Sequence, residues 1–260
     1  MKITAAMLFL VAGLCTTASA SPIHAITDGN QIYGASQSGK WIDDSTVARK
    51  LKGGEHYTFY GFDSRLGRGI GGKPAATTDP HCPGQIVANF SHVPDKTVIG
   101  IAASWNALPR KPHVESVDQP AFKKVVADYL KANGISNPDV DITQIVRCDI
   151  DGRGQDSTII TASYDYFDKS DGSKWPFYVV LLRKSVHDHV VTVPILGDVA
   201  QKPDAGLYPT EAKICGLYDL AGDGKMEIVV QANYTDSVMS YIYAVDDGHA
   251  KTVLSTGCSS

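Results

Sequence analysis

The sequence predicts a mainly β protein with one clear α-helix. Two observations support this prediction. The C-terminal half contains two copies of a repeat, and each copy reads as four short strands separated by turns. A single amphipathic segment, residues 118–134, has the end signals of a helix. We therefore expect two four-stranded antiparallel, blade-like meanders, at residues 142–196 and 212–256.

Residues 1–20 read as a cleavable secretory signal peptide. Lys2 gives a positive start, residues 3–14 are apolar, and Ala18-Ser19-Ala20 has the small side chains that signal peptidase requires. The apolar run is short for a membrane-spanning helix, and no later segment approaches that length. We expect a mature chain that begins at Ser21, has no membrane anchor, and is exported to the periplasm or the extracellular space.

Charge excludes some partners. The 260 residues carry 24 Lys and Arg against 28 Asp and Glu, a net charge of −4, and loss of Lys2 with the signal makes it −5. A mildly acidic protein is a poor ligand for nucleic acid or for an anionic membrane. The mature chain is long enough for one sizeable core or two small ones.

Residues 21–117 form a β-rich N-terminal half. Strands are predicted at 56–62, 86–90 and 97–102, and a long Gly- and Pro-rich loop at 67–83. Residues 104–119 read as a linker. We expect this half to form one compact domain with residues 135–260.

The helix lies between these halves. Asp118 can cap it, Pro120 suits its first turn and Gly134 suits a left-handed exit. Its apolar side chains share one face, which indicates packing on a sheet; they are Phe122, Val125, Val126, Tyr129 and Leu130.

The repeat is clearest in two acidic, glycine-containing segments. Residues 149–154 read Asp-Ile-Asp-Gly-Arg-Gly, and residues 219–224 read Asp-Leu-Ala-Gly-Asp-Gly. Each copy continues into runs of Val, Ile, Thr and Tyr bounded by Gly and Asp turns. The predicted strands are 143–147, 157–163, 176–182 and 189–195 in the first copy, and 212–217, 227–233, 240–245 and 250–255 in the second.

These segments resemble the calcium loops of FG-GAP and VCBS-type repeats, which read Asp-x-Asp-Gly-Asp-Gly-x-x-Glu. In such loops carboxylates at positions 1, 3, 5 and 9 and a carbonyl at position 7 surround Ca²⁺. The second loop has Asp219, Asp223, Glu227 and the Lys225 carbonyl at positions 1, 5, 9 and 7, but Ala221 at position 3. The resemblance therefore implies weak calcium binding there.

The first loop departs further from the pattern. It keeps Asp149 and Asp151 but has Arg153 at position 5. For either loop the alternative is a metal-free turn whose carboxylates accept backbone N–H groups. For the first loop we favour that alternative, with Arg153 paired to Asp149 or Asp151 in place of an ion.

Four cysteines remain after Cys15 leaves with the signal, and an even number in an exported protein suggests disulfides. We predict a Cys148–Cys215 bond, which would join the strands that lead into the two loops. A Cys82–Cys258 bond would hold the chain end to the long N-terminal loop. Other pairings, and free buried thiols, stay open.

Aromatic residues gather on corresponding turns of the two copies: Tyr164, Tyr166 and Trp175 in the first, and Tyr234 in the second. Aromatics on turns can stack on sugar rings, and they also fill the ends of β cores. His187 and His189 could share a strand face and hold a metal, but a solvated turn is the more common meaning.

No motif points to catalysis. Residues 34–39 lack the second glycine of a nucleophile elbow, and no paired carboxylates lie in an apolar setting. The leading hypothesis is a non-enzymatic binding or structural module for a carbohydrate or protein ligand, with calcium as its one candidate cofactor. The alternative is a secreted hydrolase of polysaccharide or peptide.

The whole chain also resembles a family of uncharacterised bacterial exported proteins. The segments that carry this resemblance are Gly39-Lys40-Trp41, 51–55, Pro109-Arg110, 131–135, 180–184 and Gly257-Cys258. It implies family membership and no particular chemistry.

Overall fold

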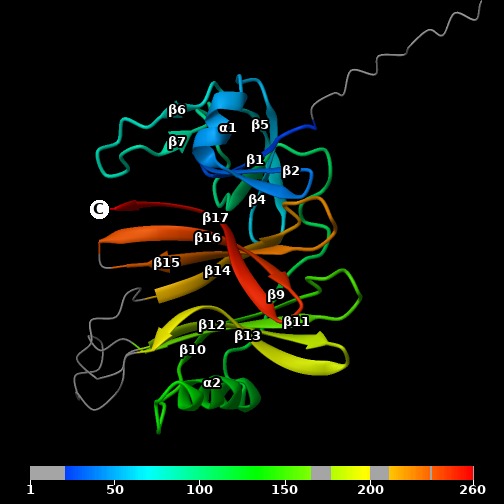
Figure 1. Ribbon diagram of the computed structural model, residues 1–260, viewed down its shortest axis with the longest axis vertical. Coiled ribbons are helices and arrows are strands. Elements are labelled where there is room, and N and C mark those ends of the chain that lie inside the picture. Colours follow the sequence, from blue (N-terminus) through cyan, green and yellow to red (C-terminus); the bar gives the residue numbers. More distant parts are fainter. Residues whose placement is uncertain (1–20, 165–176, 200–210, 235, 260) are drawn as a thin grey trace, which may run out of the picture.

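The computed structural model describes residues 21–164, 177–199, 211–234 and 236–259. Within these residues the chain is mainly β, with three antiparallel sheets and two helices (Figure 1). The predicted signal peptide lies outside the described residues. No helix in the described part is long and apolar enough to cross a membrane.

The N-terminal sheet has eight strands, in the order β5-β4-β8-β1-β2-β7-β6, with β3 paired to β2. The strands are β1 His24–Asp28, β2 Gln31–Gln37, β3 Lys40–Asp43, β4 His56–Tyr60, β5 Arg65–Ile70, β6 Ala75–Ala76, β7 Ile86–Val87 and β8 Ile99–Ile101. The three predicted strands correspond to β4, β7 and β8. The prediction misses the others. β5 and β6 cross the segment predicted as a loop, because β5 mixes glycines with arginines and β6 has only two residues, so neither shows apolar alternation.

The first repeat copy forms a five-stranded sheet in the order β13-β12-β11-β10-β9, and the second forms a four-stranded sheet in the order β14-β15-β16-β17. The strands are β9 His113–Val114, β10 Ile142–Cys148, β11 Ser157–Tyr164, β12 Phe177–Val186, β13 His189–Val199, β14 Glu211–Tyr218, β15 Glu227–Asn233, β16 Ser237–Asp246 and β17 His249–Ser259. The predicted four-stranded meander is therefore present at the C-terminus. The first copy gains a fifth strand because the predicted linker adds β9 to its edge.

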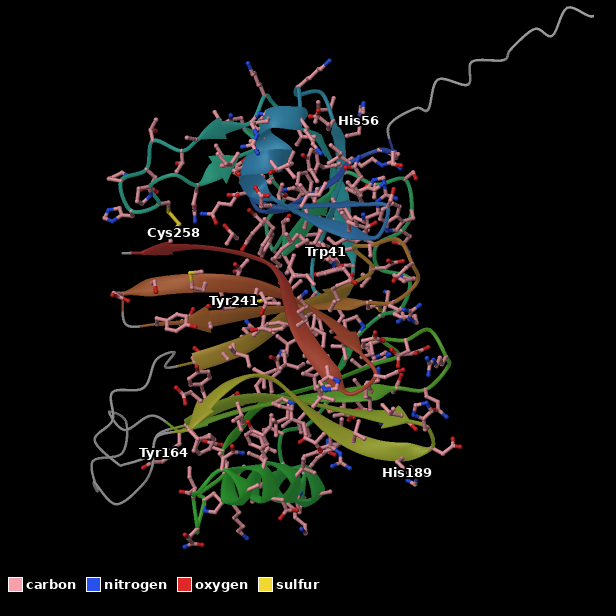
Figure 2. All side chains as sticks on the ribbon, in the orientation of Figure 1. Trp41, His56, Tyr164, His189, Tyr241 and Cys258 are labelled. Atoms are coloured by element: carbon pink, nitrogen blue, oxygen red, sulfur yellow. A yellow bond between two sulfur atoms is a disulfide. The ribbon has the colours of Figure 1, made fainter. Side chains whose placement is uncertain are left out.

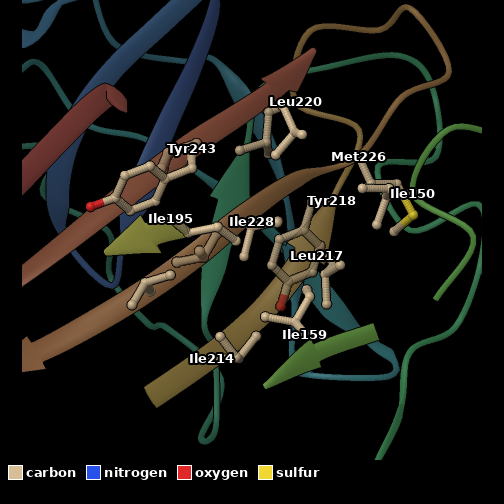
Figure 3. Packing of buried hydrophobic residues seen from close by; sticks show 14 of the residues in the cluster. Ile150, Ile159, Ile195, Ile214, Leu217, Tyr218, Leu220, Met226, Ile228 and Tyr243 are labelled. Atoms are coloured by element: carbon tan, nitrogen blue, oxygen red, sulfur yellow. The ribbon is translucent and has the colours of Figure 1, made fainter. Parts of the chain in front are cut away.

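The sheets are stacked. Figure 1 shows the β14–β17 sheet in the middle, the N-terminal sheet on one side of it and the β9–β13 sheet on the other. One apolar cluster joins all three sheets. Figure 3 shows part of it, where Ile159 and Ile195 of the first copy pack with Ile214, Leu217 and Ile228 of the second.

Helix α2, Pro120–Ala132, covers the outer face of the β9–β13 sheet as predicted, with Val126 and Leu130 buried against it. Gly134 takes the expected left-handed conformation, at φ +100°. The predicted cap is wrong. Gln119 occupies the cap position without a side-chain cap bond, and Asp118 pairs with Lys123 instead.

A second helix, α1 Asp44–Lys50, was not predicted from the sequence. Its N-cap is Asp43, whose carboxylate accepts the Thr46 N–H at 2.8 Å. Only Val47 on this helix is buried. A helix of two turns with one buried side chain leaves no apolar periodicity to detect.

Cys82 and Cys258 form the predicted disulfide, which joins the long N-terminal loop to β17 (Figure 2). The predicted Cys148–Cys215 bond is wrong, since both cysteines are free. The Gln144 side chain bonds to both backbone groups of Ile214, so Cys215 lies beside Gln144. Cys148 is four residues further along β10, about 13 Å away, whereas a disulfide needs Cα atoms within about 7 Å.

We expect non-reducing peptide mapping to recover a Cys82–Cys258 peptide and two free thiols. Replacing both Cys82 and Cys258 by serine should lower the free energy of unfolding by about 2–5 kcal/mol, because the bond closes a long loop in the unfolded chain. Denaturant unfolding measures this change. A matched Cys215→Ser variant should unfold as the wild type does, and a Cys148–Cys215 peptide would contradict this assignment.

Candidate functional site

The second acidic loop is built around the buried carboxylate of Asp219. One of its oxygens accepts the N–H groups of Gly222 at 2.7 Å and Asp223 at 3.1 Å, and the other accepts that of Gly224 at 3.0 Å. Burial raises the pKa of Asp219 above its ordinary value, because its effect outweighs that of these hydrogen bonds, which lower the pKa. The carboxylate satisfies three backbone donors that the sharp turn would otherwise leave unpaired.

Glu227 closes the loop from the first residue of β15. It is 4% exposed, and its Oε2 accepts the Leu220 N–H at 2.8 Å. Burial raises the pKa of Glu227 to about 8, and the charges of Asp223 and Asp219 add to the rise. The hydrogen bond from Leu220 lowers the pKa but does not offset these effects. The Glu227 side chain is therefore protonated over much of the neutral range.

The first loop repeats this design with fewer bonds. Asp149 accepts the N–H groups of Arg153 at 3.0 Å and Gly154 at 2.8 Å. Burial alone raises its pKa, but these bonds and the Arg110 charge outweigh burial, so the pKa is lowered. The predicted pairing of Arg153 with an acid is wrong: the cation on Asp151 is the buried Lys184, at 2.9 Å.

The segment 104–119 ties the two loops together. Arg110 donates from Nε to the Asp149 carbonyl and from Nη2 to the Gly224 carbonyl, the latter at 2.6 Å. Trp105 donates from Nε1 to the Asp219 carbonyl at 2.8 Å. The two loops are also joined directly, because the Met226 N–H donates to the Ile150 carbonyl at 2.8 Å.

The arrangement of these residues does not fit calcium. Both oxygens of Asp219 and one oxygen of Glu227 already accept backbone N–H groups, and Ala221 supplies no ligand at position 3. Among the described residues, no three acidic, histidine or cysteine side chains are grouped so that they could hold a metal ion. The first loop is poorer still, because Lys184 neutralises Asp151. These loops have the geometry of hydrogen-bonded turns.

The predicted aromatic residues do not form a platform in the described structure. Tyr164 is buried in the core beneath α2, while Tyr166 and Trp175 lie outside the described residues. The half-buried Tyr234 shares a hydroxyl–hydroxyl bond of 3.1 Å with Tyr241. His187 and Asp188 form the β12–β13 turn, both at positive φ, which supports the turn interpretation of this segment.

Sequence reasoning missed a groove centred on Trp41. Residues Ser38 and Gly39 form a tight turn with φ of 52° and 72°, which sets Trp41 opposite Ser36. The buried Ser36 hydroxyl donates to the Leu220 carbonyl at 2.8 Å, so this hairpin is fixed on the second acidic loop. Figure 2 shows Trp41 at the junction of the N-terminal sheet with the β14–β17 sheet.

Two cavities of about 360 and 450 Å³ share Trp41 and Val253 as walls, and together we call them the Trp41 groove. The first is lined by Asp43 and Asp44 of the α1 N-terminus. The polar side chains lining the second are Asp223, Lys225, Glu227, Asp246, His249 and Lys251. The one available sequence signal was the Gly39-Lys40-Trp41 segment, which carries part of the family resemblance.

Comparison of the chain with protein-family models, with curated proteins and with solved structures gives no match.

We predict that Asp219→Ala lowers the free energy of unfolding by roughly 2 kcal/mol or more, because three backbone donors lose their acceptor. Asp223→Ala, which removes one acceptor for the Lys225 N–H, should cost less. Denaturant unfolding of both variants measures the difference. Saturating calcium should leave the wild-type melting temperature unchanged; a rise that Asp223→Ala abolishes would establish a calcium site instead.

The raised pKa of Glu227 also predicts that the free energy of unfolding depends on pH. Its folded pKa of about 8 lies above the ordinary 4.5, so the folded state holds a proton that the unfolded state has lost between these values. The contribution of the Glu227 side chain to the free energy of unfolding is complete below pH 4.5 and is lost as the pH rises toward 8. Glu227→Gln, which keeps an acceptor for Leu220, should melt several degrees higher than wild type at pH 8 and equally at pH 4.5. An unchanged difference across this range would refute the shift.

Proposed function

We propose that this protein is an exported, non-enzymatic binding module and that the Trp41 groove binds a carbohydrate. The observation that carries the proposal is a half-buried tryptophan that lines two cavities together with several carboxylates. Export follows from residues 1–20 as read in the sequence. The likeness of the two meanders to propeller blades belongs to the same proposal and rests on their strand order and their corresponding acidic loops.

The chemistry of the groove suits a sugar. A sugar ring offers a C–H face that packs on an indole, and hydroxyl groups that need acceptors. Asp44 and Asp246 can supply those acceptors along the lining. Lys225 pairs with Asp246 at 3.6 Å, and both side chains are exposed, so a ligand can exchange with that contact.

The groove is also rigid. The β2–β3 hairpin is held by the Ser36–Leu220 bond, and Gly34 packs so closely on Ile42 and Leu254 that a Cβ there would come within 2.7 Å of the Leu254 side chain. A wall fixed before binding loses little entropy when the ligand arrives. We propose that the acidic loop acts here as a structural turn that positions the hairpin.

One observation favours the alternative, a hydrolase of polysaccharide. Glu227 lines the groove with its pKa raised to about 8, and Asp223 lies in the same lining. A protonated acid near a carboxylate is the pairing that glycoside hydrolysis uses. One oxygen of Glu227, however, accepts the Leu220 N–H, which gives this side chain a structural role in the loop.

Affinity electrophoresis in gels that contain soluble neutral polysaccharides, such as xylan and mixed-linkage β-glucan, tests the proposal. We expect retardation by at least one polymer and about tenfold weaker binding for Trp41→Ala, corresponding to roughly 1.4 kcal/mol of lost stacking. Trp41→Tyr keeps an aromatic ring and should retain part of the affinity.

Tyr234→Ala is the matched control, because it removes an aromatic outside the groove. If Tyr234→Ala loses binding and Trp41→Ala does not, the ligand occupies the turn aromatics and the groove proposal is wrong. Incubation of the retained polymer with the protein should release no reducing ends. Release that Glu227→Gln abolishes would establish the hydrolase.

A further inference from the structure

A third cavity, of about 410 Å³, lies on the N-terminal sheet and shares no lining residue with the Trp41 groove. It forms where β4 and the edge strand β5 meet the chain that follows β8, and we call it the basic pocket. Its charged and aromatic lining residues are His56, Tyr57, Tyr60, Arg65, Arg68 and Trp105. Figure 2 marks His56 at the outer side of this sheet.

Strand geometry brings these side chains to one face. His56, Thr58 and Tyr60 alternate along β4 and so share a face. Arg68 is the cross-strand neighbour of Thr58, and Arg65 is that of Tyr60. Both arginines therefore extend over the same surface of an edge strand.

The rear of the pocket is fixed by hydrogen bonds. The Tyr60 hydroxyl donates to Asn106 Oδ1 at 3.3 Å and accepts the Ala107 N–H at 3.2 Å. Trp105 is held by its bond to the Asp219 carbonyl and by a T-shaped contact with the His24 ring, with ring centroids 4.5 Å apart. Tyr60 and Trp105 therefore form a preorganised floor and wall.

The charges are unbalanced. No aspartate or glutamate lines the pocket. Throughout the described residues, no acidic side chain forms an ion pair with Arg65, Arg68 or His56, although acids outnumber bases in the sequence. Two guanidinium groups near each other without a counter-charge repel, and an anion between them removes that cost.

We infer that the basic pocket is a binding site for an oxyanion, a phosphate, sulfate or carboxylate group, carried on a small molecule whose ring packs against Trp105. Arginine presents a planar fork of donors that matches an oxyanion with two parallel bonds. Ser104, exposed at the rim, adds a hydroxyl donor. This site shares no lining residue with the Trp41 groove and does not depend on the glycan proposal.

Titration by heteronuclear NMR tests the inference, with three probes: inorganic phosphate, glucose 6-phosphate and glucose. The indole N–H signal of Trp105, assigned from a Trp105→Phe variant, reports on the pocket, and that of Trp41 reports on the groove. We expect both phosphates to shift the Trp105 signal with saturation and glucose to leave it in place. Tighter binding of glucose 6-phosphate than of inorganic phosphate would identify a ring-bearing ligand. Equal binding of the two phosphates would identify a free oxyanion as the ligand.

The variant Arg65→Gln/Arg68→Gln should weaken phosphate binding at least about tenfold, as expected for loss of a bidentate charged contact. Both arginines are exposed, so this variant should keep the wild-type melting temperature. Arg153→Gln, an exposed arginine on the first acidic loop, is the matched control and should bind as wild type does. Equal phosphate binding by the double variant and wild type, or no shift of Trp105 with any phosphate, would overturn the inference.

Discussion

The burial of the β14–β17 sheet on both faces is the constraint on which the rest of the molecule depends. Ile228, Val229 and Val230 are consecutive residues of β15 and are all at most 1% exposed, so neither face can carry polar groups freely. One face packs on the first repeat copy and the other on the N-terminal sheet. The N-terminal half is therefore a required cover for the second copy, because a lone meander would expose one apolar face to water.

A sheet covered on both faces also restricts its loops. Where β14 leaves the core, the backbone of Asp219 and Leu220 is still shielded from water, so each N–H and C=O needs a protein partner. The Asp219 N–H donates to the Ala107 carbonyl, and its carbonyl accepts from Trp105. The Leu220 N–H donates to Glu227 and its carbonyl accepts from Ser36. Four partners from three parts of the chain meet at two residues, which gives this acidic loop a structural role that needs no calcium.

The C-terminal half could be predicted from the sequence because its signals are local. The recurrence of acidic loops at 149–154 and 219–224 indicated the order of the four strands that each copy supplies, though not the added strand β9, and the helix face was visible in its spacing. The N-terminal half offered no such signals: β5 interleaves glycines with arginines, and β6 has two residues. Its strands exist because partners distant in the sequence pair with them. The site was missed for the same reason, since Trp41 gains the cavity of about 450 Å³ from the second acidic loop, β16 and β17, which are all distant from it in the sequence.

Both candidate sites depend on the second acidic loop. The hairpin that carries Trp41 is fixed through Ser36 to Leu220, and the wall of the basic pocket is fixed through Trp105 to Asp219. The first loop instead binds Arg110 and the Met226 backbone, and so joins one copy to the next. The corresponding loops of the two repeat copies therefore differ in role. The first joins the stacked copies, and the second positions Trp105 and the hairpin that carries Trp41. A change in the second loop should therefore alter both surfaces together, whereas a change in Arg65 or Trp41 should alter only its own.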